Sequence, residues 1–158
     1  MRIVVFSDSH RDFFGLKKVV EAQPAAALFL HLGDHIRDME DIRNCYPEKA
    51  VLGVPGNCDY GSDAPLTRVI EEGGVRIAMA HGHTLGVKGS LEPLKKWTRE
   101  EDAQIALFGH THVPVCSYED GLYLLNPGSL GHPRDGRPSY GIIDITPNGI
   151  VTNIIYLK

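Results

Sequence analysis

Hydrophobic residues gather in five short runs within the first two thirds of the chain, and most of these runs are continuous rather than alternating. The runs are Ile3–Phe6, Ala27–Leu30, Ala50–Val54, Val75–Ala80 and Ile105–Phe108. Continuous apolar runs of this length are typical of strands that are covered on both faces. We therefore expect five largely buried strands.

Three segments between these runs have the spacing of amphipathic helices. Residues Phe13–Ala22 place apolar side chains every three or four positions, and Asp12 precedes them as a candidate N-cap. Further helices are expected over Asp38–Cys45 and over Leu91–Glu101, where an apolar stripe also recurs. The first of these helices joins two expected strands and predicts a βαβ unit.

The last third of the chain has a different pattern, that of antiparallel hairpins. Val113–Tyr118 and Leu122–Leu125 flank a Glu-Asp-Gly turn, and Tyr140–Thr146 and Ile150–Leu157 flank Pro-Asn-Gly. The fold class predicted from the two halves is a mixed α/β or α+β fold, with mixed sheets and helices outside them. The last strand is a candidate edge at which a second copy would pair to form a homo-oligomer.

Length and charge limit the function. The 158 residues, 42% of them hydrophobic, predict a single domain over 1–158 with one well-buried core. The net charge of -4 gives no basic footprint, so we expect neither an obligatory nucleic-acid partner nor an anionic membrane surface. A phosphate-bearing substrate would then need a bound cation to offset its charge.

Cysteine usage favours the cytoplasm. Cys45, Cys58 and Cys116 are odd in number and form no CxxC pair, which argues against a disulfide framework and a structural zinc site. The opening apolar run reaches Asp8 too soon for a signal peptide, and no run approaches the ~20 residues that span a bilayer. We expect a soluble cytoplasmic protein.

Metal-binding residue types follow every one of the five hydrophobic runs. In order along the chain they are Asp8 and His10, then Asp34, then Asn57, then His81 and His83, then His110 and His112. Because ligands bind beyond the carboxyl ends of strands in open α/β sheets, these segments are expected to converge. The three pairs are spaced i, i+2, and would point the same way if the chain stayed extended.

Imidazoles, carboxylates and an amide form a mixed nitrogen and oxygen ligand set, which suits Mn, Fe, Ni or Zn and suits Ca poorly. A carboxylate such as Asp34 is able to bridge two ions. Two ions about 3.5 to 4 Å apart lower the pKa of a shared water and hold a phosphoryl oxygen during in-line attack. Hydrolysis of a phosphate ester is the reaction that uses all of these features.

The order of the motifs resembles the calcineurin-like metallophosphoesterases, in particular their small, cap-less YfcE-type phosphodiesterase subgroup. The motifs are Asp8-Ser-His10, Gly33-Asp34, Gly56-Asn57, His81-Gly-His83 and Gly109-His110-Thr-His112, with Asn126-Pro-Gly-Ser129 as a further segment of that subgroup. A single Asp-x-His would be a weak signal, whereas five motifs in order are highly specific.

The resemblance implies two packed, mixed β-sheets flanked by helices, and two divalent ions per chain. Manganese is favoured, with nickel, iron or zinc as alternatives. The first ion would be held by Asp8, His10, Asp34 and His112, and the second by Asp34, Asn57, His81 and His110. The implied reaction is hydrolysis of a small-molecule phosphate ester, most often a diester, by a hydroxide that bridges the ions. Asn57, Cys58, His81 and His83 are the candidate catalytic residues.

Cys58 departs from the family pattern, because many members carry a histidine at that place. A thiol is a poor substitute for an imidazolium as a proton donor, so the sequence favours esters with good leaving groups, or a proton from His83, Asp59 or water. The plainer interpretation is a small buried thiol in a turn.

Several other polar residues have structural interpretations. His31 lies inside an expected strand and is interpreted as packed, His35 and Asp38 belong to the first turn of a helix, and Asp59 is as consistent with a turn as with ligand orientation. His132, Arg134 and Arg137 occupy an irregular loop, where solvation is favoured over phosphate binding.

Two other functions remain as alternatives to a phosphoesterase. One is a catalytically weak or inactive scaffold of the same fold that binds protein partners, and the other is a metal-binding or regulatory protein with negligible turnover. The complete set of ligand residues argues against the scaffold.

Overall fold

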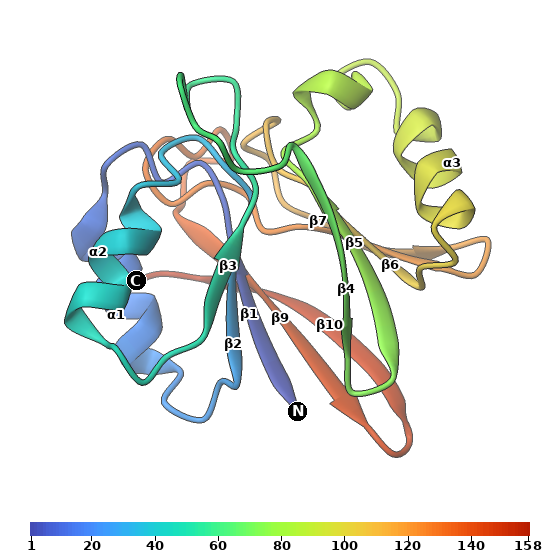
Figure 1. The fold of residues 1–158 in the computed structure, drawn as a ribbon. Helices are drawn as coiled ribbons and strands as arrows, with labels where there is room; N and C mark the ends of the chain where they lie inside the picture. Colours follow the sequence, from blue (N-terminus) through green and yellow to red (C-terminus); the bar gives the residue numbers. More distant parts are fainter.

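The computed structural model describes residues 1–158 as two five-stranded sheets (Figure 1). The first sheet has the order β10-β9-β1-β2-β3, and its strands are Arg2–Phe6 (β1), Leu28–His31 (β2), Val51–Gly53 (β3), Ser139–Thr146 (β9) and Gly149–Tyr156 (β10). The second sheet has the order β4-β5-β6-β8-β7, with Thr67–Glu72 (β4), Val75–Ala80 (β5), Ile105–Leu107 (β6), Val115–Glu119 (β7) and Leu122–Asn126 (β8). Both sheets mix parallel and antiparallel pairs, as predicted.

Strand β1 illustrates why the hydrophobic runs are continuous. Ile3 and Val5 belong to the core between the two sheets, whereas Val4 and Phe6 belong to the core under the helices of the first sheet. Successive side chains of a strand point to opposite faces, so a strand covered on both faces needs apolar residues at every position.

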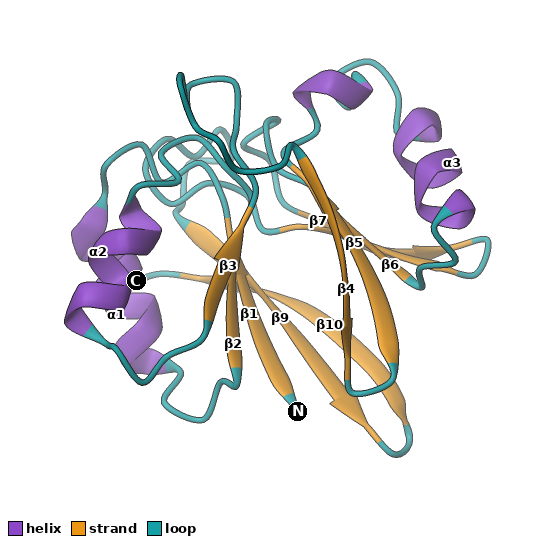
Figure 2. Cartoon of the chain, in the orientation of Figure 1, coloured by secondary structure: helices purple, strands orange, loops and turns teal.

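The helices lie on the outer faces of the sheets (Figure 2). Helices α1 (Phe13–Ala22) and α2 (Asp38–Cys45) pack on the first sheet, and α3 (Glu92–Glu100) packs on the second. Asp12 caps α1 as predicted, because its carboxylate accepts a hydrogen bond from the Gly15 N–H at 2.9 Å. The bounds of α1 and α2 agree with the prediction, and α3 is one residue shorter at each end.

Two elements were absent from the prediction. Strand β4 is an edge strand without any fully buried residue, and its polar sequence leaves no strong strand signal. It pairs with β5 through Gly73 and Gly74, both at positive φ, which is a hairpin signal that could have revealed the strand. The second element is a single 3-10 turn, η1 (His83–Leu85), directly after β5.

The sheet edge, the cysteines and the helices bear on three further expectations. Strand β10 does form an edge of the first sheet. All three cysteines are unpaired and exposed, and the exposure of Cys58 overturns its interpretation as a buried thiol. None of the helices has the length and apolar character needed to cross a membrane.

Candidate metal centre

The loops that follow the parallel strands of both sheets gather in one region of the molecule. β1, β2 and β3 are parallel in the first sheet, and β5 and β6 are parallel in the second. The loops that follow these strands carry all of the predicted ligand residues, and Figure 2 draws many of the loops together at one end of the two sheets. The candidate ligands are Asp8, His10, Asp34, Asn57, His81, His110 and His112.

The backbone at this site is not extended, which corrects one assumption of the prediction. Asp8, His10, Asp34, His110 and His112 all have positive φ, with values of 52°, 45°, 57°, 66° and 59°. Such angles are uncommon for residues other than glycine and cluster at functional sites. The paired side chains therefore converge because the chain turns sharply after each strand.

One group of four side chains has the arrangement of a metal site. The ligand atoms of Asp8, His10, Asp34 and His112 all lie within 4.8 Å of one another. His112 Nε2 is 3.0 Å from Asp8 Oδ1 and 3.5 Å from His10 Nε2. Two donors about 2.1 Å from one ion are about 3.0 to 3.4 Å apart, so these spacings fit a shared divalent cation.

A second group adjoins the first through Asp34. His81 Nε2 lies 3.1 Å from Asn57 Oδ1 and 3.5 Å from Asp34 Oδ2. The His110 ring is next to that of His81, with centroids 5.0 Å apart. Asp34 thus lies between the two groups: its Oδ2 is also 3.8 Å from His10 Nε2.

Hydrogen bonds to carbonyls orient two of the imidazoles. His81 Nδ1 lies 2.7 Å from the Leu32 carbonyl oxygen, and His112 Nδ1 lies 2.7 Å from that of His132. A carbonyl oxygen only accepts, so Nδ1 of each ring must carry the proton. Nε2 then keeps its lone pair toward the carboxylates, as a metal ligand requires.

The surroundings of the Asp8 carboxylate are those expected of a cation ligand. Its Oδ2 accepts hydrogen bonds from Ser7 Oγ at 2.5 Å and from the His110 N–H at 3.1 Å. Its Oδ1 is buried and accepts no hydrogen bond of acceptable geometry, although His112 Nε2 is close. A buried carboxylate oxygen without a donor is costly, and a bound cation would remove that cost.

The site favours an ionised Asp8 and neutral His10 and His110, whereas His112 is favoured in its protonated form. Burial acts to raise the pKa of Asp8, but its contact with His112 and the charges nearby hold that pKa below its usual value. Burial lowers the pKa of His10, and lowers that of His110 to about 4. The pKa of His112 is raised by Asp8. A cation would replace the proton of His112 as the partner of Asp8.

A buried chain of hydrogen bonds supports the first two ligand loops, and no local sequence pattern predicts it. The Gly33 N–H donates to His31 Nδ1 at 2.9 Å, so His31 Nε2 carries the proton and donates to Ser9 Oγ at 3.0 Å. The Ser9 hydroxyl donates to Asp38 Oδ2 at 2.6 Å. His31 is packed, as predicted, while Asp38 is a buried acceptor rather than only the charged first residue of α2.

The other residues singled out from the sequence lie around the cluster. His83 is half-buried, its Nδ1 has no hydrogen-bond partner, and its ring centroid is 5.4 Å from that of His81. Cys58 is exposed, and its backbone N–H donates to Asp34 Oδ1 at 2.8 Å. Partial desolvation of its sulfur by neighbouring atoms, together with the nearby Asp34 charge, raises the pKa of the Cys58 thiol, so it is not a thiolate nucleophile at neutral pH.

Asp59 and the 127–138 loop have clear positions. The Asp59 carboxylate accepts three backbone hydrogen bonds, from His35, Ile36 and Gly56 at 2.8, 2.9 and 2.7 Å, and so fixes the turn. His132 lies beside His10, with ring centroids 4.6 Å apart. Arg137 lies over the Tyr156 ring, with its guanidinium carbon 4.4 Å from the centroid, and not at the cluster.

The fold and this cluster agree with the family to which sequence comparison assigns the chain. Residues 1–148 match the calcineurin-like phosphoesterase superfamily domain, and the chain belongs to that family. It is 30% identical over 171 residues to phosphodiesterase YfcE of Escherichia coli K12, which covers 91% of this chain and 88% of that protein.

Two other similarities bear on function. A solved structure of a predicted phosphoesterase from Streptococcus pneumoniae TIGR4 has a TM-score of 0.80 at 27% identity, over 98% of this chain and 97% of that one. Vacuolar protein sorting-associated protein 29 of Schizosaccharomyces pombe is 42% identical over 105 residues, which is 64% of this chain and 54% of that protein.

Proposed function

We propose that the chain, acting as one domain over residues 1–158, is a metal-dependent phosphodiesterase. The observation that carries this proposal is the shared position of Asp34, whose Oδ2 lies 3.8 Å from His10 Nε2 and 3.5 Å from His81 Nε2. A carboxylate between two groups of donors is suited to bridge two ions. We assign the first ion to Asp8, His10, Asp34 and His112 and the second to Asp34, Asn57, His81 and His110.

Two bound divalent ions, with manganese as the favoured metal, would lower the pKa of a shared water and offset charge on the phosphoryl group. The chain's part is to hold the donors in place before the substrate arrives. The carbonyls of Leu32 and His132 keep His81 and His112 in the required tautomer. The Cys58 N–H keeps the Asp34 carboxylate from turning away.

The side chains next to the cluster favour esters with good leaving groups. His83 has a lowered pKa because burial disfavours its charged form, so at neutral pH its ring is mostly uncharged and donates a hydrogen bond to a phosphoryl oxygen but has no imidazolium proton to give. Cys58 is exposed but carries only a weakly acidic thiol. Neither group is suited to protonate a poor leaving group, so water supplies that proton.

The test is hydrolysis of bis-p-nitrophenyl phosphate and of p-nitrophenyl phosphate after removal of metal with a chelator and addition of Mn, Ni, Fe, Zn or Mg. We expect activity that depends on the metal and is higher on the diester. Asn57→Ala and His81→Ala should lower kcat/KM by about 100-fold or more, since each loses a proposed ligand. Asn44→Ala is the matched control, because Asn44 is exposed on α2 and makes no side-chain hydrogen bond.

The result that contradicts the proposal is an absence of metal-dependent hydrolysis in the wild type, or equal activity in the wild type and the His81→Ala variant. Either result would favour the alternative of a catalytically weak or inactive scaffold that binds protein partners. The likeness to a vacuolar sorting protein over 105 residues supports that alternative. The presence of every expected ligand residue supports the enzyme.

A further inference from the structure

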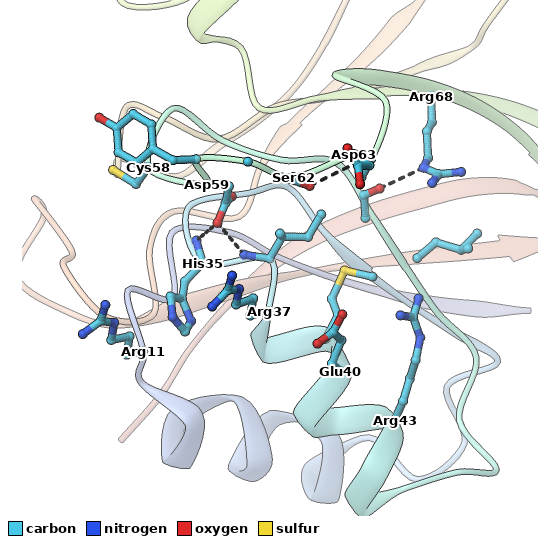
Figure 3. A pocket seen from close by; sticks show the side chains of 17 residues that line it. Arg11, His35, Arg37, Glu40, Arg43, Cys58, Asp59, Ser62, Asp63 and Arg68 are labelled. Carbon is cyan, nitrogen blue, oxygen red and sulfur yellow. Dashed lines mark hydrogen bonds between the residues drawn. The ribbon is translucent and has the colours of Figure 1, made fainter.

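A cavity of about 610 Å³ lies between α2 and residues 58–64, beside the candidate metal centre (Figure 3). A smaller hollow of about 260 Å³ is lined by His10, Arg11, His35, Cys58 and His132. Arg11, His35 and Cys58 line both spaces, so the cavity adjoins the space next to the proposed ligand His10. A molecule that reaches the metal centre can therefore extend into this cavity.

Arginine side chains dominate the charge of the cavity. Four of the nine arginines of the chain line it, namely Arg11, Arg37, Arg43 and Arg68, and no lysine does. Figure 3 draws Arg37 and Arg43 along α2, with Arg11 and Arg68 at opposite ends of the labelled group. This concentration contrasts with the net charge of -4 of the whole chain.

None of the four guanidinium groups forms an ion pair with a carboxylate. Arg43 donates through Nη2 to the Val51 carbonyl at 2.7 Å, and Arg68 donates through Nε to the Gly53 carbonyl at 2.8 Å. These two bonds hold the side chains in place and leave their other N–H groups free. Arg11 and Arg37 make no side-chain hydrogen bond within the protein, so the cavity has many free donors for an anion.

The carboxylates of the cavity cancel this charge only in part. Asp59, Glu40 and Asp63 also line it, but both oxygens of Asp59 already accept backbone hydrogen bonds. A hydrogen-bonded carboxylate keeps its charge, so four guanidinium groups and three carboxylates leave the lining with one positive charge in excess. The cavity favours an anion over a neutral or cationic group.

We propose that this cavity binds a second phosphate group on the substrate, which makes phosphodiesters that carry an additional phosphate the preferred substrates. The inference rests on the proposed phosphodiesterase function and adds the class of substrate. Arginine presents paired N–H donors that match phosphate geometry, which lysine does not. One exposed arginine gains little from an anion, but four around one cavity act together.

A matched pair of substrates tests the inference. One is thymidine 5′-(p-nitrophenyl phosphate), and the other is the same compound with a 3′-phosphate, assayed with saturating Mn at low ionic strength. We expect kcat/KM to be about 10-fold or more higher for the 3′-phosphorylated compound, as charge-assisted hydrogen bonds to phosphate would give. Added NaCl should reduce this preference, because salt screens exposed charges.

Variants assign the preference to the cavity. The double variant Arg11→Gln, Arg37→Gln should reduce the ratio of the two kcat/KM values to within about twofold, since two free guanidinium groups are lost. Arg99→Gln is the matched control, because Arg99 is exposed on α3 and lies outside the cavity, and it should keep the wild-type ratio.

The outcomes separate the two proposals. If the wild type hydrolyses both compounds equally with added metal, the cavity inference is overturned and the phosphodiesterase function stands. A preference that survives in the double variant also overturns the inference, because the phosphate is then recognised elsewhere. If neither compound is hydrolysed in a metal-dependent way, both proposals fail.

Discussion

At the scale of single residues, most of the candidate ligands adopt a backbone conformation that costs free energy. Five of them have positive φ without being glycine, and each such residue costs on the order of 1–3 kcal/mol. The surrounding contacts must hold them there. Gly109 is one such contact, because the chain passes so close to β1 at this point that a methyl group would overlap Ser7 Oγ and Asp8 Oδ2.

The first prediction concerns this close approach. Gly109→Ala should push the Asp8 carboxylate out of position, lowering metal-dependent activity at least about tenfold and the free energy of unfolding by about 1–3 kcal/mol. Gly89→Ala is the control, because its added methyl would find only the Gly86 carbonyl oxygen at 3.6 Å. Kinetics and urea unfolding measure the two effects. Wild-type activity in Gly109→Ala would show that the site tolerates a shift of Asp8.

The second prediction concerns His31, whose ring is fully buried. Burial lowers the pKa of His31 to about 4, below the value of about 6.5 expected in the unfolded chain. Between these values the unfolded state binds a proton that the folded state does not. The free energy of unfolding should therefore fall as the pH falls from 6.5 toward 4, by up to about 1.4 kcal/mol per pH unit from this residue.

Urea unfolding in a chelator between pH 7.5 and pH 4.5 measures this dependence. His31→Asn cannot gain the proton, yet its amide oxygen is able to accept from the Gly33 N–H. The variant should lose less stability than the wild type over the same pH range. Parallel pH profiles for the two proteins would mean that His31 keeps an ordinary pKa in the folded state.

At the scale of secondary structure elements, α1 is held by one face. Leu16 is fully buried against the first sheet, whereas the neighbouring Phe14 is 78% exposed. Two large apolar side chains of the same helix thus differ strongly in how much they contribute to the stability of the fold. The free energy of unfolding depends on Leu16, because the solvent exposure of an already exposed side chain changes little on unfolding.

Our third prediction compares these two positions. Leu16→Ala should lower the free energy of unfolding by about 3 kcal/mol, since it leaves a cavity under the helix. Phe14→Ala, which removes the larger side chain, should change it by less than about 0.5 kcal/mol. Urea denaturation measures both changes, and the m-values should stay the same as in the wild type. A cost of more than 1 kcal/mol at Phe14 would contradict the burial of this face.

At the scale of the whole molecule, the sequence predicts the layers well and the site only in part. Continuous hydrophobic runs determine where buried strands lie, so the five runs correspond to β1, β2, β3, β5 and β6. Strand β4 was not predicted, because an edge strand needs few apolar residues. Elements that bury little leave a weak hydrophobic pattern.

The rest of the site depends on contacts between distant segments. The strand-end motifs reveal the ligand types, because residue type and position after a strand are local properties. The chain from His31 through Ser9 to Asp38 joins residues up to 29 positions apart. The arginines of the cavity are likewise scattered from Arg11 to Arg68, and no local pattern brings them together.

The fourth prediction follows from the sharing of the site between the two sheets. Asp8, Asp34 and Asn57 follow strands of the first sheet, while His81 and His110 follow strands of the second. A cation held by both sheets binds the folded chain only. Manganese at 100 times its Kd should add about 2.7 kcal/mol to the free energy of unfolding for each ion bound.

Thermal and urea unfolding with and without manganese measure this gain, with magnesium as a comparison. Asp34→Asn should lose most of the gain, because it weakens the carboxylate between both groups of donors. Asn44→Ala should keep it. An equal response to manganese in the Asp34 variant would mean that the stabilising metal binds at another place.

The pairing of β1 with β9 governs when the site can form during synthesis. Residues Arg2–Val5 pair with residues Gly141–Asp144, and Ser129 Oγ donates to the Asp8 carbonyl at 2.8 Å. A nascent chain that ends before these residues leaves one edge of β1 unpaired and the Asp8 carbonyl without its Ser129 donor. Because domains fold as units, the first ligand to leave the ribosome must wait for almost the whole chain before it can hold a metal.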